Sequence, residues 1–268
     1  GDDSAMRQRD YLVEDLLTDS ASAGVRLRGS VHVEAAPGDP LDEIEWLATV
    51  RAATGLPSVA VAALDLGADD ADDALDVLAS REIVRGVREI VAWHADQHAT
   101  FAAVPDLTDQ PRWRQRYARL GDMGLSFDLQ LYPSQLGAAG RLADAEPEVA
   151  LAIVHTASPL FGDDADRSVW ASGLGALAER PNTVLKISGL GMFFHSDAVR
   201  PEAFDVVARA VDTFGPDRVM FGSNFPVDGI NRTYAETYAL FDEATAGFDR
   251  REREAMFAGN AARFYRIS

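Results

Sequence analysis

The stretch that decides the fold is RVMFGSNFPVD, residues Arg218–Asp228. Its apolar run Val219–Phe221 predicts a short buried strand, which Gly222 and Pro226 then end. Polar side chains follow directly, Asn224 among them. Parallel strands carry functional residues at their C-terminal ends, so a buried strand that ends in polar side chains is typical of an α/β active site.

Strand-like segments recur along the chain, and helix-like segments separate them. The strands are expected at residues 30–35, 58–64, 84–90, 125–132, 149–155, 184–189 and 219–223. Repeated βα units predict a parallel sheet. We expect an α/β fold, a distorted (β/α)8 TIM barrel whose first strand is absent from this chain, because a closed barrel of this type needs eight strands. An open doubly wound sheet, which needs no eighth strand, is the alternative.

Length and composition narrow the class of protein. The chain has 268 residues, 47% of them hydrophobic, and no linker-like stretch divides it, so one domain over 1–268 is expected. The net charge of −18 opposes binding to nucleic acid or to anionic membranes. The chain has no cysteine, no long apolar run and no secretory signal. These features predict a cytoplasmic protein that acts on a small molecule, and they leave a homo-oligomer open.

Polar residues occur in or at the ends of most of these strands, where alternation decides which of them share a face. The groups that share a face are His32 with Glu34, Asp128 with Gln130 and Tyr132, and Lys186 with Ser188. Arg88 lies in the third strand and His155 ends the fifth. A lone histidine at a strand end is structural more often than catalytic. Buried charge is costly unless it is paired, however, so polar residues on several strands together predict a functional centre.

The sequence shows no strong metal pattern. HxH and HExxH are both missing, and a zinc centre needs three or four ligands. His32, Glu34 and His155 are the strand-end candidates. We therefore expect no cofactor, or a weakly held divalent metal such as zinc or manganese. A dinucleotide fingerprint, a phosphate loop and a GxSxG nucleophile elbow are also absent from the sequence.

Seven short motifs form a set that is more specific than any one of them. They are VHVEA (31–35), GVR (86–88), FDLQL (127–131), VHTASP (154–159), VLKISGL (184–190), MFGSNFPVD (220–228) and NAARFY (260–265). The set resembles the amidohydrolase-related family, in the branch of 2-pyrone-4,6-dicarboxylate lactonase and the sugar lactonases. The resemblance covers roughly residues 9–267. It implies a distorted TIM barrel that hydrolyses a lactone or a related ester or amide.

The resemblance also implies roles for single residues. His155 matches the family's strand-six histidine, and Arg88 matches a strand-four arginine placed to hold a substrate carboxylate by a bidentate contact. Asn224 stands at the strand-eight position, where much of the superfamily has an aspartate that takes a proton from the attacking water. An amide cannot act as that base at neutral pH. The proton acceptor is then expected to be His155, Glu34 or Asp228, with Asn224 orienting water or substrate.

The family's first strand carries HxH, and nothing upstream of Arg9 supplies it. We therefore expect a strand with HxH to precede Gly1 in the native gene. The predicted function is hydrolysis of a small cyclic ester. The residues expected to bind its carboxylated substrate are Arg88, His32, Gln130, Tyr132, Lys186 and Ser188. A non-oxidative decarboxylase of the same superfamily and a non-catalytic barrel that binds a small molecule are the alternatives.

Overall fold

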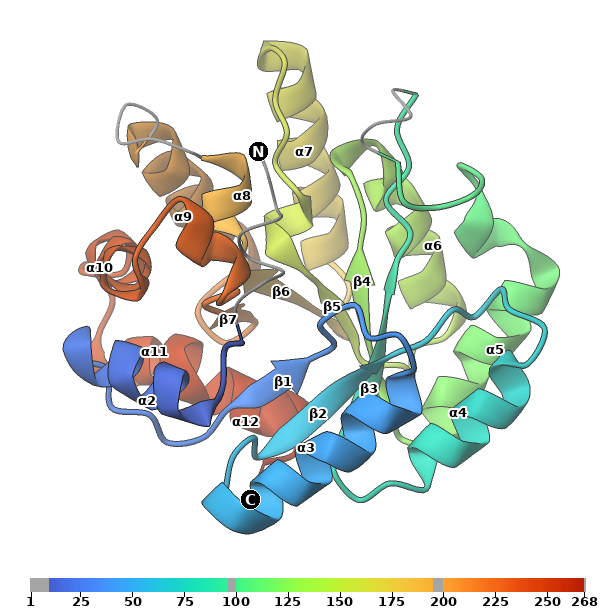
Figure 1. Cartoon of the computed structure of the whole chain (residues 1–268). Helices are drawn as coiled ribbons and strands as arrows, with labels where there is room; N and C mark the ends of the chain where they lie inside the picture. The colour runs from blue at the N-terminus through green and yellow to red at the C-terminus, as the bar shows by residue number, and fades with distance from the viewer. Residues whose placement is uncertain (1–9, 96–99, 195–199, 268) are drawn as a thin grey trace.

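The computed structural model describes residues 10–95, 100–194 and 200–267. Within these residues seven parallel strands form one sheet, in which each strand pairs with the next along the chain (Figure 1). The strands are β1 (Val31–Val33), β2 (Val59–Ala63), β3 (Val84–Ile90), β4 (Ser126–Gln130), β5 (Leu151–Ile153), β6 (Thr183–Ile187) and β7 (Val219–Phe221). All seven predicted strands are confirmed. The strictly sequential order is that of a barrel, because a doubly wound sheet reverses its strand order at a switch point.

The sheet is surrounded by helices, most of them on its outer side (Figure 1). They are α2 (Val13–Ser22), α3 (Pro40–Thr54), α4 (Ala71–Ala79), α5 (Pro111–Asp122), α6 (Leu136–Ala145), α7 (Asp164–Ala178), α8 (Leu190–Phe193), α9 (Arg200–Phe214), α10 (Tyr234–Ala244), α11 (Arg250–Glu254) and α12 (Asn260–Phe264). Short turns of 3-10 helix lie at Leu107–Asp109, Pro133–Gln135, His155–Ala157 and Val227–Ile230, and a π turn at Ala255–Gly259.

Local sequence explains where these helices begin and end, and α3 is a clear case. The Asp39 carboxylate accepts a hydrogen bond from the Leu41 amide at 2.8 Å, and Pro40 occupies the first turn, where its missing N–H costs nothing. Gly55 ends the helix at φ +81°, in the left-handed region that glycine adopts without strain.

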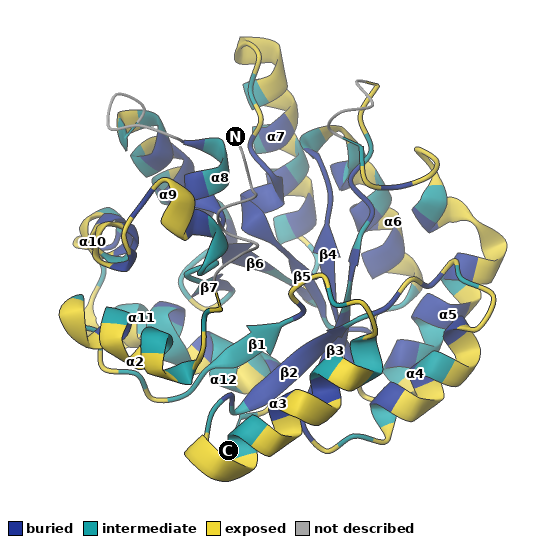
Figure 2. Ribbon diagram, in the orientation of Figure 1, coloured by how far each residue is buried: buried dark blue, intermediate teal, exposed yellow. Residues whose placement is uncertain are grey.

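Side-chain alternation divides the core into two parts. Outward-facing residues of the strands, such as Val87, Phe127 and Leu185, pack under the helices in the larger hydrophobic cluster. Figure 2 shows the strands mostly buried and the helices exposed on their outer faces. The residues that alternate with these along the strands, such as Val61 and Met220, face inward and form a second cluster inside the curled sheet. Parallel strands end on the same side, so their polar end residues meet there.

The C-terminal segment enters this inner cluster. Tyr265 is 1% exposed and packs with residues of β2, β5 and β7, while Val31 and Val33 of β1 lie against the same cluster. The Asn260 side chain anchors α12 by donating to the carbonyl of Pro216 at 2.7 Å and to that of Val219 at 2.5 Å. The segment therefore lines the interior next to both edge strands of the sheet.

In the part of the chain that the structure describes, no helix is both long enough and apolar enough to cross a membrane.

Candidate active site

Arg88 lies at the centre of a polar cluster inside the curled sheet. Its Nη1 donates to Glu34 Oε1 at 2.9 Å, and its Nη2 donates to Gln130 Oε1. The same Nη2 lies 3.3 Å from His155 Nε2. The Arg88 and Glu34 side chains are only 12% and 7% exposed. One guanidinium thus joins groups from the ends of β1, β4 and β5.

The neighbours of His155 fix its tautomer. An arginine nitrogen donates and cannot accept, so Nε2 carries the lone pair and the ring proton lies on Nδ1. Nδ1 then donates to Ser188 Oγ at 3.0 Å. Burial, together with the charges of Arg88 and Lys186, holds the pKa of His155 well below its usual value. The ring is therefore neutral at pH 7 and presents a basic nitrogen next to Arg88.

The backbone at His155 is strained. His155, Thr156, Ala157 and Ser158 all have positive φ, between +49° and +58°, although none is a glycine. Each such residue costs about 1–2 kcal/mol, and a β-branched residue like Thr156 is a particular outlier there. The Thr156 carbonyl accepts a hydrogen bond from Trp170 Nε1 at 2.8 Å, which anchors the turn to α7. Strain of this kind persists where the surroundings impose it, commonly at active sites.

The close approach of the His155 ring to the backbone explains why residue 189 is a glycine. Gly189 follows β6 and has φ +70°. A Cβ at this position would lie 2.7 Å from His155 Nδ1, closer than a Cβ approaches the atoms around it. Glycine at 189 therefore lets the imidazole lie against the backbone beside Ser188.

A second polar group lies on the same inner face as Arg88. Lys186 Nζ donates to Asp128 Oδ2, and the Tyr265 hydroxyl lies 3.0 Å and 2.9 Å from the two oxygens of Asp128. The lysine nitrogen also lies 5.2 Å from the centre of the Tyr265 ring. Burial lowers the pKa of Lys186, and the pairing with Asp128 opposes that shift. The only lysine of the chain is thus a buried partner of Asp128.

Asn224 and Asp228 form a separate pair after β7. Asn224 Nδ2 donates to Asp228 Oδ1 at 2.8 Å, and the Gly191 amide donates to Asp228 Oδ2 at 3.0 Å. Burial raises the pKa of Asp228 to about 6. Both oxygens of Asp228 thus hold the loop after β7 against α8. Asn224, in the left-handed region at φ +55°, keeps its carbonyl oxygen as an acceptor.

The structure corrects the prediction that His32 and Glu34 share a face. His32 Nε2 lies 3.1 Å from Glu43 Oε1 on α3, on the outer side of the sheet, whereas Glu34 reaches Arg88 on the inner side. The reason is that β1 ends at Val33, so the strict alternation of a strand no longer governs Glu34. His32 is therefore not part of the cluster around Arg88.

Tyr132, also predicted to bind substrate, follows β4 and is 8% exposed. Its ring packs edge-on against His94, with the ring centres 6.0 Å apart. It thus lies beside the loop that follows β3.

A divalent metal does not fit the residues of this cluster. In residues 10–95, 100–194 and 200–267, no group of three or more His, Asp or Glu side chains is placed to hold a metal ion. The Arg88 guanidinium lies between Glu34 and His155 Nε2, the two groups suited to bind one. A cation already satisfies both, and a second would be repelled.

The comparisons with known proteins place the chain in a family. A family model described as amidohydrolase matches residues 3–267. The chain belongs to the amidohydrolase family. The expected resemblance and the expected TIM-barrel class are therefore confirmed, and the chain is a hydrolase by family.

Two relatives and one solved structure place the chain among the amidohydrolases. An uncharacterized protein, y4mH, of Sinorhizobium fredii is 36% identical, over 100% of this chain and 89% of its own. An L-fucono-1,5-lactonase of Burkholderia ambifaria is 28% identical, over 97% and 86%. A crystal structure of an amidohydrolase from Burkholderia multivorans with bound zinc is 24% identical, with a TM-score of 0.85 over 100% and 93%. The last likeness shows the fold alone.

Sequence reasoning missed the part that Tyr265 plays. The residue lies in the motif NAARFY, but nothing in the spacing says that its hydroxyl reaches Asp128 on β4, 137 positions away. The one signal in the sequence that points to Asp128 is strand alternation, which places it on the same face of β4 as Gln130.

Proposed function

We propose that this amidohydrolase hydrolyses a lactone of a small hydroxylated or carboxylated acid. The observation that carries the proposal is the buried cluster in which Arg88 contacts Glu34, Gln130 and His155. A fixed guanidinium beside a neutral imidazole supplies an anion-binding group and a proton acceptor in one place. The lactonase name of the Burkholderia ambifaria relative supports the same class of substrate.

Arg88 binds the substrate in this proposal. Its Nη2 contacts Gln130 and His155, both of them neutral, while its Nη1 is held by the charged Glu34. A substrate carboxylate or carbonyl oxygen competes more easily for Nη2, because it replaces neutral partners there, whereas at Nη1 it would have to break the ion pair with Glu34. Glu34 thus keeps the guanidinium in place while Nη2 exchanges its neutral partners for the substrate.

His155 takes the proton from the attacking water. Both oxygens of Glu34 are already used, by Arg88 and by the Ala36 amide at 2.7 Å. Both oxygens of Asp228 are used as well, by Asn224 and Gly191. The lone pair on Nε2 of His155 is thus the acceptor that becomes available when the substrate binds to Arg88. A substrate anion on Arg88 also weakens the repulsion that lowers the pKa of His155, so the bound substrate makes its own base stronger.

Asn224 orients the reacting groups. Its amide nitrogen is tied to Asp228, which leaves its carbonyl oxygen to accept a hydrogen bond at the end of β7. An acceptor at that position aligns the attacking water without taking its proton.

The test is steady-state kinetics of the full chain on sugar 1,4- and 1,5-lactones and on a pyrone dicarboxylate, followed with a pH indicator. We expect Arg88→Lys, which keeps the charge but loses the planar fork, to weaken binding by about 1.5–3 kcal/mol, seen as a higher KM. We expect His155→Ala to lower kcat by about 10²–10⁴-fold. Arg28→Lys is the matched control, because Arg28 is 59% exposed and pairs with Glu254.

Unchanged rates in both site variants would place the chemistry elsewhere. Release of CO₂ from a carboxylated substrate without ring opening would contradict lactone hydrolysis and favour a decarboxylase.

A further inference from the structure

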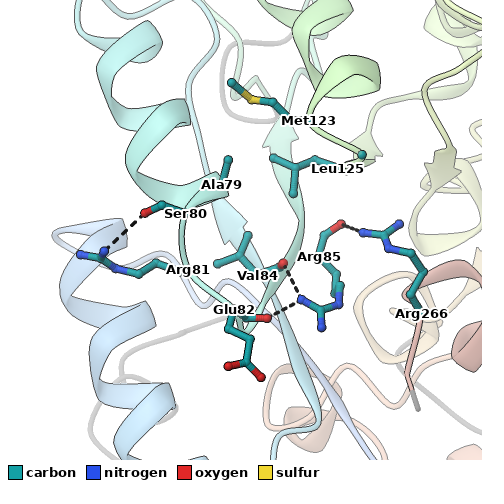
Figure 3. A pocket seen from close by; sticks show the side chains of 10 residues that line it. Ala79, Ser80, Arg81, Glu82, Val84, Arg85, Met123, Leu125 and Arg266 are labelled. Atoms are coloured by element: carbon teal, nitrogen blue, oxygen red, sulfur yellow. Dashed lines mark hydrogen bonds between the residues drawn. The ribbon is translucent and has the colours of Figure 1, made fainter.

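A hollow of about 420 Å³ opens at the opposite end of the sheet from Arg88 (Figure 3). The last residues of α4, the turn into β3, the turn between α5 and β4, and Arg266 near the C-terminus line it. Val84 and Leu125 give it an apolar floor and are 4% and 5% exposed. We call it the arginine hollow, because Arg81, Arg85 and Arg266 all contribute to its wall. Its volume lies in the usual range for small-molecule sites.

Two of these arginines lack a carboxylate partner. Arg85 Nη1 donates to the carbonyl oxygens of Glu82 and of Val84, the latter at 3.1 Å. Arg266 Nη2 donates to the carbonyl oxygen of Arg85 at 3.0 Å. In the described part of the chain neither guanidinium forms a salt bridge, although the protein carries a net charge of −18. The arginine hollow is thus a positive site on an acidic molecule.

The other charged residues of the arginine hollow already have partners. Arg81 Nη2 lies 3.0 Å from Glu45 Oε1, and the Glu82 carboxylate lies 3.7 Å from Arg51 Nη1. Figure 3 shows the Glu82 carboxylate directed away from Arg85 and Arg266. The uncompensated charge is therefore that of Arg85 and Arg266.

Both guanidinium groups are positioned rather than freely mobile. Backbone carbonyls hold Arg85, and the Arg85 carbonyl in turn holds Arg266, whose backbone adopts the left-handed region at φ +53°. Burial, with the charge of Arg85, lowers the pKa of Arg266, which shows that the two positive groups act on each other. An anion bound beside them would offset that repulsion and accept hydrogen bonds from their remaining N–H groups.

We propose that the arginine hollow binds the phosphate group of a small phosphorylated molecule, or free phosphate, through Arg85 and Arg266. Two arginines offer two positive charges and several unused donors, which match a dianion with three terminal oxygens better than a single carboxylate. Val84 and Leu125, which also line the hollow, offer apolar contacts to the rest of such a molecule. The site is separate from the cluster around Arg88 and does not depend on the lactonase activity.

The test is calorimetric titration of the full chain, in low-salt buffer free of phosphate, with inorganic phosphate and with glycerol 3-phosphate. We expect saturable binding with one site per chain. Arg85→Gln and Arg266→Gln should each weaken it about tenfold or more, since each removes charged hydrogen bonds. Arg263→Gln, which makes the same charge change in α12 outside the hollow, should bind as the unchanged chain does. Arg266 is exposed, so its variant keeps the test valid if Arg85→Gln fails to fold.

Tighter binding of glycerol 3-phosphate than of phosphate would support a phosphorylated metabolite, and equal binding would support free phosphate. The proposal is overturned if no saturable heat appears, or if Arg266→Gln and Arg263→Gln bind phosphate equally well. It is also overturned if succinate binds more tightly than either phosphate compound. A third outcome is that the chain forms a dimer, that Arg266→Gln dissociates this dimer, and that phosphate does not bind. This result would show that an acidic surface of a second copy fills the hollow instead.

Discussion

Arg88 joins several members of the buried polar cluster. It satisfies Glu34, contacts Gln130 and lies against the lone pair of His155. Its charge keeps a second cation away and, after burial, contributes most to the low pKa of His155. The same residue thus sets the charge of the cluster and the tautomer of His155.

The low pKa of His155 gives a prediction on pH. In a plot of kcat/KM against pH, the acidic limb reports the protonation of the free base. This limb should lie below pH 6.5, so kcat/KM should be constant from about pH 6.5 to 8 and fall only in more acid solution. Arg88→Gln should move the limb towards higher pH, because it removes a positive charge beside the ring. Proton NMR titration of the histidines checks the shift without relying on activity.

The folded chain must remain intact during this measurement. The neutral His155 ring resists protonation in the folded state, so the unfolded chain binds the extra proton and stability falls as the pH drops below about 6.5. Unfolding curves at each pH separate the two effects. A limb at or above pH 6.5 in the unchanged enzyme would contradict the role of His155 as the base.

Asn224→Asp tests whether the amide merely stands in for a lost base. The new carboxylate would face Asp228, whose oxygen now lies 2.8 Å from the amide nitrogen. Two carboxylates at this distance repel, and Asp228 would lose a donor while it is 1% exposed. We expect lower activity on lactones and a lower melting temperature. Faster hydrolysis in this variant would instead show that position 224 is the natural place of the base.

At the scale of elements, alternation predicts side-chain direction well inside strands of five or more residues. It places Arg88, Gln130 and Lys186 on the inner face, because β3, β4 and β6 are long enough to keep a period of two. It fails at β1, which has three residues, where Glu34 lies beyond the strand. The boundary of a short strand depends on tertiary contacts, and these leave no periodic signal in the sequence.

The turn at 155–158 could not be predicted at all. Left-handed backbone is usually signalled by glycine or asparagine, and the sequence His-Thr-Ala-Ser contains neither. Packing around the turn imposes its shape, as the bond from Trp170 Nε1 to the Thr156 carbonyl shows. The strain is thus a property of the folded molecule rather than of the local sequence.

Ser158→Gly measures that strain. Ser158 has φ +49°, and its hydroxyl is buried with no hydrogen-bond partner among the described residues. Glycine removes both costs, so we expect a gain of about 1 kcal/mol in unfolding free energy and a melting temperature about 2–4 °C higher. The reverse control is Gly24→Ala, because Gly24 has φ +68° and open space around it, so the substitution should lower the stability of the fold through backbone strain alone. Gly175→Ala cannot serve as this control, because Gly175 lies in a helix. A lower melting temperature for Ser158→Gly would contradict the strain argument.

At the scale of the whole molecule, residues near the C-terminus pack into the interior of the curled sheet. Tyr265 brings its ring into the cluster shared by β2, β5 and β7, and its hydroxyl reaches Asp128. Asp128 in turn pairs with Lys186, so residues from the middle and the end of the chain form one buried polar group. A buried ion pair is stable only if its other hydrogen-bonding capacity is satisfied, and Tyr265 supplies that donor.

Two tyrosine variants, for which we expect opposite effects on stability, test this role. Tyr265→Phe keeps the ring but removes the donor to Asp128, which is fully buried, so we expect a loss of about 1.5–3 kcal/mol in unfolding free energy. Tyr117→Phe is the matched control, because the Tyr117 hydroxyl is equally buried but has no partner within the described residues. Its removal should be neutral or stabilising, since burying an unpaired hydroxyl costs free energy. Denaturant titration of both variants gives the two values, and equal losses would show that Tyr265 acts only through its ring.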